Sequence, residues 1–260
     1  MAAAYRALWI SDIHLGTSAA RAADLLGFLD SVAADTIYLI GDIVDLQRLK
    51  LRPRFPPDHR RVIARLLELA QCGTRVVYVP GNHDVEFRHL AGRTLGGIAV
   101  ELESRHECIS GRELLIIHGD CLDRQVRRGT QLEQFGAAAY QWLVRADASL
   151  NRFGNCFGHD CASISSRIKL RLKYANDYIR RYEETAARYA ARRGFDGIVC
   201  GHIHRPAIRQ IDGTWYANDG DWVEHRTALA ETCDGQMQIL QWSSANVGVV
   251  AAPRQATLAA

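Results

Sequence analysis

The chain lacks the features that mark secreted or membrane-embedded proteins. Its seven cysteines include no CxxC pair, and an odd number cannot complete a disulfide framework. No segment approaches the roughly 18 consecutive apolar residues of a membrane-spanning helix. The first residues, MAAAYRALWISDIHLG, lack a basic stretch followed by a long apolar core, so we expect no secretory leader. These absences favour a cytoplasmic protein with reduced thiols.

The chain also lacks a strong charge of either sign, internal repeats and low-complexity linkers. The net charge of +3 suits an anionic substrate or surface but does not indicate nucleic-acid binding, so no nucleic-acid partner is expected. With 260 residues, 48% of them hydrophobic, the chain can bury a large core. We expect one domain over residues 1–260, with one insertion.

Three apolar runs alternate with amphipathic segments in the first half. The runs are YRALWIS, TIYLIGD and TRVVYVP. Residues 17–33 have helical spacing behind a Thr17/Ser18 cap, and residues 57–73 have it with Gly73 as the stop signal. Such alternation predicts a largely parallel sheet covered by helices.

The second half predicts short strands on either side of a long helical segment. The strands fall within residues 97–120 and 196–242, and residues 121–194 have helical character throughout. Residues 165–194 are basic and amphipathic. Two interpretations stay open, namely helices that cover the sheet or a helical cap inserted beside an active site at about 121–194, and we adopt the second.

Polar residues follow nearly every apolar run. GNHD, residues 81–84, is ambiguous by itself, because Gly, Asn and Asp also form ordinary turns. In open α/β sheets, however, the functional crevice lies outside the carboxyl ends of the strands. Residues two apart in an extended segment point to the same side, which would let each DxH or HxH pair converge. The candidate ligands are Asp12, His14, Asp42, Asn82, His118, His202 and His204.

The candidate ligands are oxygen and imidazole donors. Any one of the histidines could be a structural residue, but seven such residues in this order predict a metal centre. They exceed the needs of one tetrahedral zinc ion and suit two five- or six-coordinate ions such as Mn²⁺ or Fe²⁺ with a bridging carboxylate.

The order DxH, GDxxD, GNHD, HGD and GHxH resembles the calcineurin-like metallophosphoesterase superfamily from residue 8 to about 225. The resemblance implies a four-layer αββα sandwich, with two mixed sheets between helices, and a hydrolase with two divalent cations. Mn²⁺ is the expected metal, with Fe²⁺ or Zn²⁺ as alternatives. It also implies that the first ion is held by Asp12, His14, Asp42 and His204, and the second by Asp42, Asn82, His118 and His202.

The same resemblance implies roles for the groups around the metals. His83 would face the phosphate as a general acid or charge stabiliser, and Asp84 would hold its imidazole in one tautomer. Asp45 is interpreted as a structural or supporting carboxylate. Residues 218–224 either support the HxH turn or form a plain β-turn.

Further motifs are similar to the UDP-2,3-diacylglucosamine diphosphatase branch, including SDIHLGT, YLIGDIVD and VCGHIHRPAIRQIDGTWYANDGDWVEHRTAL. This branch implies hydrolysis of a UDP-glycolipid to UMP and an acyl-sugar 1-phosphate in lipid A biosynthesis. It implies a peripheral location on the cytoplasmic face of the inner membrane.

His83 departs from that branch, whose well-characterised members have Arg in a GNRD motif. Arg is a permanent planar cation, whereas His titrates. Three alternatives therefore stay open: a related glycolipid, a soluble phosphodiester or nucleotide, and a metal-stabilised binding module without catalysis.

The insertion supplies the expected substrate contacts. Asp120, Asp123 and Lys169 or Lys173 are candidates for nucleotide and sugar contacts. A basic run of this kind can also be a solvated face, and helically spaced aromatics can also be core. The candidate acyl-chain pocket comprises Phe135, Tyr140, Trp142, Leu143, Val144, Phe153 and Phe157, beside Arg167 and Arg171.

Overall fold

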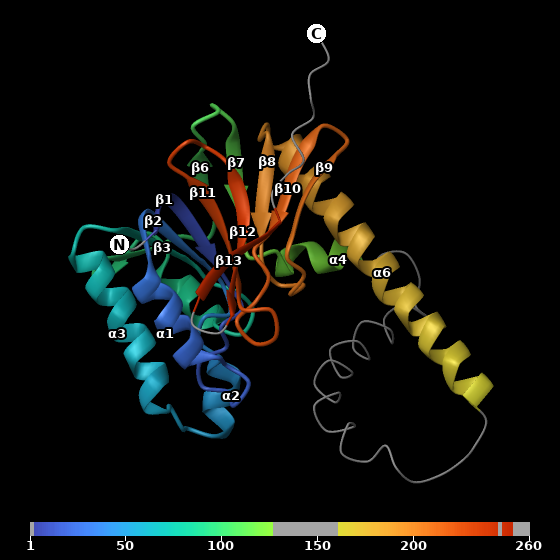
Figure 1. Ribbon diagram of the computed structural model, residues 1–260, viewed down its shortest axis with the longest axis horizontal. Coiled ribbons are helices and arrows are strands. Elements are labelled where there is room, and N and C mark those ends of the chain that lie inside the picture. The colour runs from blue at the N-terminus through green and yellow to red at the C-terminus, as the bar shows by residue number, and fades with distance from the viewer. Residues whose placement is uncertain (1–2, 127–160, 244–245, 252–260) are drawn as a thin grey trace. The chain divides into compact units, whose positions relative to one another are not determined.

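The computed structural model describes residues 3–126, 161–243 and 246–251 (Figure 1). The chain divides into two compact units, Met1–Asp120 with Ala187–Ala260, and Cys121–Ala186. Both sheets belong to the first unit. The second unit contains α4 (Asp123–Val126) and most of α6 (Cys161–Arg192), so the expectation of helix is confirmed there for the described residues. A cap at residues 121–194 stays a prediction.

The first sheet has eight strands in the order β13-β12-β11-β1-β2-β3-β5-β4. Strands β1, β2, β3 and β5 are parallel, and β4, β11, β12 and β13 are antiparallel to their neighbours. The bounds are β1 Ala3–Ile10, β2 Val32–Ile40, β3 Arg75–Val79, β4 Thr94–Leu95, β5 Ile98–Val100, β11 Thr227–Thr232, β12 Met237–Ser243 and β13 Asn246–Ala251. The predicted parallel sheet is confirmed for the first half of the chain.

The second sheet has five strands in the order β6-β7-β8-β10-β9. Strands β7, β8 and β10 are parallel, with antiparallel β6 and β9 at the edges. The bounds are β6 Ser104–Glu107, β7 Glu113–Ile116, β8 Gly197–Cys200, β9 Ala207–Ile211 and β10 Thr214–Asn218. The α/β class with two mixed sheets is therefore confirmed.

Alternating side chains of the central strands fill two cores. In β1, Leu8 and Ile10 belong to the core beneath helices α1 (Ala22–Ser31) and α3 (Pro57–Gln71), whereas Ala7 and Trp9 belong to the core between the sheets. Strands β2 and β3 alternate in the same way, as the two-residue period of a strand requires. Helices α1 and α3 pack side by side against the first sheet (Figure 1). Burial on both faces holds the strands rigidly and so fixes the positions of their carboxyl ends.

The predicted start of the first helix is wrong. Helix α1 begins at Ala22, and its N-cap, Arg21, makes no side-chain cap. Thr17 instead donates its hydroxyl to the carbonyl of His14 at 2.9 Å, within the loop after β1. The loop backbone is occupied by pairing with the next loop, since Leu15 N donates to Ile43 O at 2.9 Å. The helix can begin only after that loop ends.

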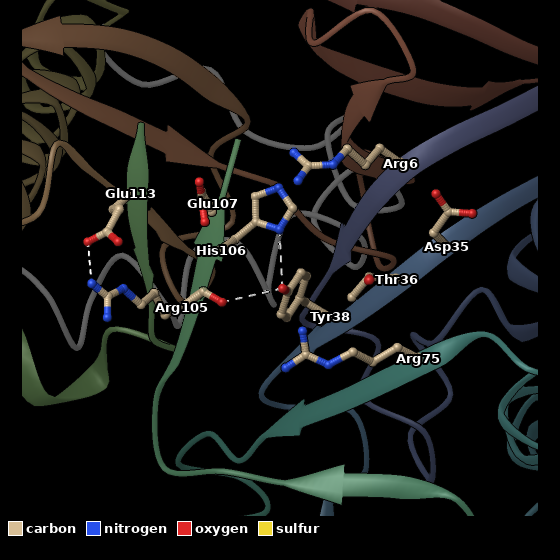
Figure 2. A pocket seen from close by; sticks show the side chains of 9 residues that line it. All are labelled: Arg6, Asp35, Thr36, Tyr38, Arg75, Arg105, His106, Glu107 and Glu113. Atoms are coloured by element: carbon tan, nitrogen blue, oxygen red, sulfur yellow. Dashed lines mark hydrogen bonds and ion pairs between the residues drawn. The ribbon is translucent and has the colours of Figure 1, made fainter. Parts of the chain in front are cut away.

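A polar pocket lies near the starts of β1, β2 and β3, away from their carboxyl ends (Figure 2). Its volume is about 450 Å³. Its guanidinium and carboxylate groups offset one another in number, and it contains none of the predicted site residues. The lining residues are Arg6, Asp35, Thr36, Tyr38, Arg75, Arg105, His106, Glu107 and Glu113.

Candidate active site

All seven predicted metal ligands lie just after strands of the first unit. Asp12 and His14 follow β1, Asp42 follows β2, and Asn82 follows β3. His118 follows β7, and His202 and His204 follow β8. Three of these strands belong to the first sheet and two to the second. The candidate site is thus built at the carboxyl edge of both sheets.

One group of side chains gathers around Asp12. Its Oδ1 atom lies 3.0 Å from Nε2 of His204 and 3.8 Å from Nε2 of His14. This oxygen is buried, and among the described residues no well-directed hydrogen bond reaches it. A buried carboxylate oxygen beside two imidazole nitrogens is suited to a cation.

A second group gathers around Asp42 and His118. His118 Nε2 lies 3.6 Å from Asp42 Oδ1 and 3.3 Å from the amide oxygen of Asn82. The ring of His202 lies beside that of His118, with centroids 5.2 Å apart. The other oxygen of Asp42, Oδ2, lies 3.9 Å from His14 Nε2. Asp42 therefore faces both groups, as a bridging carboxylate would.

The ligand loops are not extended, contrary to the expectation from sequence. Asp12, His14, Asp42, His202 and His204 have positive φ angles of 51°, 53°, 54°, 69° and 53°. Asp and His tolerate this left-handed region better than most residues, at an energetic cost of order 1 kcal/mol each. The side chains converge because these left-handed turns redirect them, and the alternation of a strand plays no part.

Two glycines make the close approach of the loops possible. A Cβ atom on Gly81 would lie 2.3 Å from Asp42 Oδ1, and one on Gly201 would lie 2.6 Å from Asp12 Oδ2. Each glycine directly precedes a candidate ligand, Asn82 or His202. Any side chain at these positions would displace a carboxylate of the candidate centre.

The charged groups shift one another's pKa values. Burial acts against ionisation of Asp12, but His204 outweighs it and lowers the pKa of Asp12 to about 2. Burial also acts against protonation of His204, but Asp12 raises its pKa to about 9. In the same way, and against burial, His118 lowers the pKa of Asp42 and Asp42 raises the pKa of His118. At neutral pH Asp12 is therefore ionised, and His204 carries a proton that a metal ion would displace.

The donor set fits a pair of divalent cations. It contains two buried carboxylates, one amide oxygen and four imidazoles, with two of the three-residue clusters sharing Asp12. Clusters of this composition are typical of dinuclear metallophosphoesterases. The division of the ligands between two ions stays a prediction.

His83 is oriented by Asp45, and the prediction that Asp84 holds it is wrong. Nδ1 of His83 lies 3.1 Å from Asp45 Oδ2, and Nδ1 of His14 lies 3.5 Å from the same oxygen. The carboxylate of Asp84 instead accepts hydrogen bonds from Tyr78 Oη, Gly81 N at 2.6 Å and Ile43 N at 2.8 Å. Asp84 therefore fixes the loop backbone.

Ser11, which sequence reasoning missed, and two residues of the 218–224 segment support Asp12 and the HxH turn. Ser11 Oγ lies 2.6 Å from Asp12 Oδ2 and 2.7 Å from Asp219 Oδ1, and both contacts are buried. Burial and the nearby carboxylate of Asp12 raise the pKa of Asp219 well above its usual value. Asn218 Nδ2 donates to the carbonyl of Gly201 at 2.6 Å. These contacts agree with the interpretation that residues 218–224 support the HxH turn.

The predicted substrate residues Asp120 and Asp123 are engaged within the protein. Arg88 Nη2 contacts both carboxylate oxygens of Asp120, at 2.8 and 2.9 Å, and also the carbonyl of Pro80 at 3.3 Å. Within the second unit, Tyr178 Oη donates to Asp123 Oδ1 at 2.8 Å. A role for either aspartate in substrate binding stays a prediction, and no local signal in the sequence indicated Arg88.

The remaining predicted contacts fall outside the described part of the chain. The side chains of Lys169, Lys173, Arg167 and Arg171 are not described, and neither are the aromatic residues proposed to line an acyl-chain pocket, from Phe135 to Phe157. Those interpretations stay predictions.

Comparison with known proteins identifies the family. The family model described as calcineurin-like phosphoesterase matches residues 5–206. The chain belongs to the calcineurin-like phosphoesterase family. It is therefore a hydrolase that acts on phosphoesters, and the family resemblance inferred from its motifs is confirmed.

Curated relatives span most of the chain and share one name, UDP-2,3-diacylglucosamine hydrolase. The protein from Azotobacter vinelandii is 30% identical over 226 residues, 83% of this chain and 90% of that one. The Stenotrophomonas maltophilia protein is 29% identical over 243 residues, 88% and 95% of the two chains. The Serratia proteamaculans protein is 27% identical over 220 residues, 78% and 84%.

Solved structures are similar at lower identity. Vps29 from Entamoeba histolytica complexed with zinc has a TM-score of 0.47 at 15% identity, covering 95% of this chain and 98% of that one. The phosphoesterase YfcE from E. coli has a TM-score of 0.47 at 16% identity, covering 94% and 98%.

None of the described helices combines sufficient length with sufficient apolar character to cross a membrane.

Proposed function

We propose that this phosphoesterase hydrolyses the pyrophosphate of UDP-2,3-diacylglucosamine, or of a closely related UDP-glycolipid, to UMP and an acyl-sugar 1-phosphate. Its support is the name shared by relatives that match 78–88% of the chain. The reaction is a step of lipid A biosynthesis.

The observation that carries the proposed chemistry is the position of Asp42. One of its oxygens lies 3.6 Å from His118 and the other 3.9 Å from His14. We assign Asp12, His14, Asp42 and His204 to one metal ion, and Asp42, Asn82, His118 and His202 to the other. Mn²⁺ is the preferred metal, with Fe²⁺ or Zn²⁺ as alternatives.

The two cations, when bound, supply Lewis acidity that activates water and offsets charge on the phosphoryl group. The protein's own groups orient that chemistry. His118 donates Nδ1–H to the carbonyl of Ile40 at 2.8 Å, which leaves Nε2 as the free ligand atom. Asp45 Oδ2 lies 3.1 Å from Nδ1 of His83, whose Nε2 lies 3.9 Å from Asp42 Oδ2. His83 is thus placed beside the centre to stabilise the phosphoryl group or to protonate a leaving oxygen.

A soluble phosphodiesterase or nucleotidase is the second candidate, and the His83–Asp45 contact favours it. A histidine paired with a carboxylate at 3.1 Å is a proton donor of the kind that a poor leaving group needs. A pyrophosphate leaving group is acidic and needs a proton less.

The location follows from the proposed substrate. A UDP-glycolipid has one charged and one apolar end, so the enzyme would act on the cytoplasmic face of the inner membrane as a peripheral protein. We also propose that residues 121–194 form a helical cap that holds the acyl chains.

One experiment separates the two candidates. Purified protein is loaded with Mn²⁺ and given UDP-2,3-diacylglucosamine or bis-p-nitrophenyl phosphate in ¹⁸O-labelled water, and both products are weighed by mass spectrometry. Strong preference for the glycolipid with label in UMP would establish the proposed function and attack at the nucleotide-side phosphorus. Turnover of the simple diester alone would discard the glycolipid and retain the phosphoesterase.

A further inference from the structure

A basic segment at the edge of the candidate active site takes no part in the chemistry described above. Residues 48–54 read RLKLRPR, with four cations in seven residues and no acidic residue between Asp45 and Asp58. They comprise the end of α2 (Leu46–Leu51) and the loop that follows it. All four cationic side chains are exposed. We call residues 48–54 the basic rim.

Folding leaves most of this charge without an opposite partner. Lys50 forms an ion pair with Glu86 on η1 (Val85–Leu90). In the described part of the chain, the guanidinium groups of Arg48, Arg52 and Arg54 have no ion-pair partner. The basic rim therefore presents three uncompensated positive charges.

An apolar side chain stands among these cations. Leu51, between Lys50 and Arg52, is 77% exposed, the largest value among the exposed large hydrophobic residues described. Val85 is 40% exposed at the start of η1, the segment that Glu86 ties to Lys50. A single exposed leucine is ordinary on a protein surface. A leucine flanked by cations on both sides, with no acidic residue nearby in the sequence, is suited to a surface that is anionic outside and apolar beneath.

The basic rim is attached directly to the candidate catalytic loops. Asp45, which contacts His83, also caps α2 by accepting a hydrogen bond from Arg48 N at 2.8 Å. Gln47 Nε2 donates to the carbonyl of Asn82 at 2.9 Å. Since six helical residues span about 9 Å, whatever binds the rim lies close to the metal centre.

We propose that the basic rim docks the protein on an anionic lipid bilayer. Arg48, Arg52 and Arg54 meet the headgroup phosphates, and Leu51 enters the boundary of the acyl chains. A nucleic acid would give Leu51 no apolar partner, and the rim contains no aromatic residue on which bases could stack. The proposal rests on the peripheral location proposed above and names the surface that docks, and its test does not depend on which phosphoester is hydrolysed.

Vesicle co-sedimentation tests the proposal on the full chain. Phosphatidylcholine vesicles with about 30% phosphatidylglycerol are compared with pure phosphatidylcholine, at low salt and at about 0.5 M NaCl, which screens surface charge. The expected result is binding to the anionic vesicles alone, weakened by salt. Removing two cations in Arg52→Gln/Arg54→Gln should lower the partition coefficient about 25-fold, because each cation near such a surface contributes about fivefold.

Matched variants separate charge, apolar contact and folding. Leu51→Ser should lower binding about tenfold, as expected for loss of a buried leucine, whereas Leu102→Ser, at a residue 58% exposed, should not. Arg105→Gln/Arg112→Gln removes the same charge on β6 and directly before β7, and should bind like the wild type. All variants should keep their hydrolysis of bis-p-nitrophenyl phosphate.

Three results would overturn the proposal. The first is equal binding by the Arg52/Arg54 variant and the wild type, which would place vesicle binding elsewhere. The second is equal binding to neutral vesicles, or none to anionic ones. The third is binding of a single-stranded oligonucleotide as tight as that of vesicles and unaffected by Leu51→Ser, which would make the rim a general polyanion site.

Discussion

At the residue scale, the carboxylates of the candidate site differ in function because they differ in what surrounds them. Asp12 and Asp42 are buried beside imidazoles that lower their pKa values. Asp84 is also buried, but burial and nearby Asp42 raise its pKa, and it is held by hydrogen bonds from the loop. Sequence alone shows aspartates at these positions; their environment assigns them to a metal centre or to the scaffold.

Asp42→Ala should abolish binding of both metal ions and all measurable turnover. Asp42 faces both groups of histidines, so its loss removes a ligand from each ion and leaves His118 without its nearest carboxylate. Metal content by mass spectrometry and Mn²⁺-dependent turnover are the measurements. Near-normal rates would contradict the shared role, and the fold is checked by the thermal midpoint.

His83→Ala should keep its metal content and lose turnover by about 10²–10⁴-fold, the range for loss of a general acid. The reason is that the imidazole of His83 approaches the carboxylate of Asp42 only at 3.9 Å and lies 3.1 Å from Asp45, which is not among the predicted ligands. Metal stoichiometry and kcat are measured together. A metal-depleted variant would show that His83 is a ligand.

At the scale of elements, the site depends on loops joined across the two sheets. Arg88, on η1, donates hydrogen bonds to the carbonyl of Pro80, directly before the GNHD loop, and to the carboxylate of Asp120, after β7. The loop after β3 carries Asn82, and the loop after β7 carries His118. Arg88 therefore ties together two loops whose ligands are assigned to the same metal ion.

Arg88→Met should weaken binding of the metal ion assigned to Asn82 and His118 about tenfold and leave the other ion unchanged. Groups that orient ligands contribute about 10- to 100-fold in affinity. Arg88→Lys keeps the positive charge but loses the paired donors of the guanidinium, so its affinity for that ion should lie between those of Arg88→Met and the wild type. Mn²⁺ titration followed by electron paramagnetic resonance resolves the two ions. Arg93→Met, an exposed neighbour, serves as the control. Equal weakening of both ions would indicate general loosening instead.

At the scale of the whole molecule, a buried polar network joins the two sheets far from the candidate site. Oε2 of Glu231, on β11, lies 2.9 Å from Nη1 of Arg6 on β1 and 2.7 Å from Nε2 of His106 on β6. His106 also lies 3.2 Å from the hydroxyl of Tyr38 on β2 (Figure 2). Glu231 has no exposed side-chain surface, so its charge depends on these partners.

Glu231→Gln should lower the free energy of unfolding by about 3 kcal/mol at pH 7, since it breaks a buried charged network. Burial opposes ionisation of Glu231, but His106, Ile109 N and Arg6 lower its pKa below the usual 4.5. The stabilisation is therefore full above about pH 4.5 and disappears as the pH falls through the lowered pKa. The difference between variant and wild type should shrink on acidification.

Urea unfolding between pH 3 and 8 measures this difference. Glu113→Gln removes the exposed partner of Arg105 and should change stability by less than about 0.5 kcal/mol at any pH. A constant difference across the pH range would show that packing, and not the charge of Glu231, accounts for the loss.

Most of the fold, and the strand ends at which the candidate ligands lie, could be predicted from sequence because both depend on short-range patterns. Apolar runs that alternate with amphipathic segments indicate a layered α/β sheet, and polar clusters after the runs indicate its functional edge. The residues next to a given position, however, do not indicate which distant residue it will contact. The contacts of Arg88 with Asp120 and of Ser11 with Asp219 join residues 32 and 208 positions apart.

The sequence by itself determined the donor types of the candidate ligands and the strand ends at which they lie, since both are local properties. Only the tertiary structure decided which carboxylate serves His83. Asp84 is its neighbour in sequence, but the turn directs that carboxylate toward Tyr78 and the amide of Gly81. The loop after β2 then brings Asp45 to within 3.1 Å of the imidazole. The backbone geometry of these loops, which depends on packing between the two sheets, determines that Asp45 and not Asp84 lies beside His83.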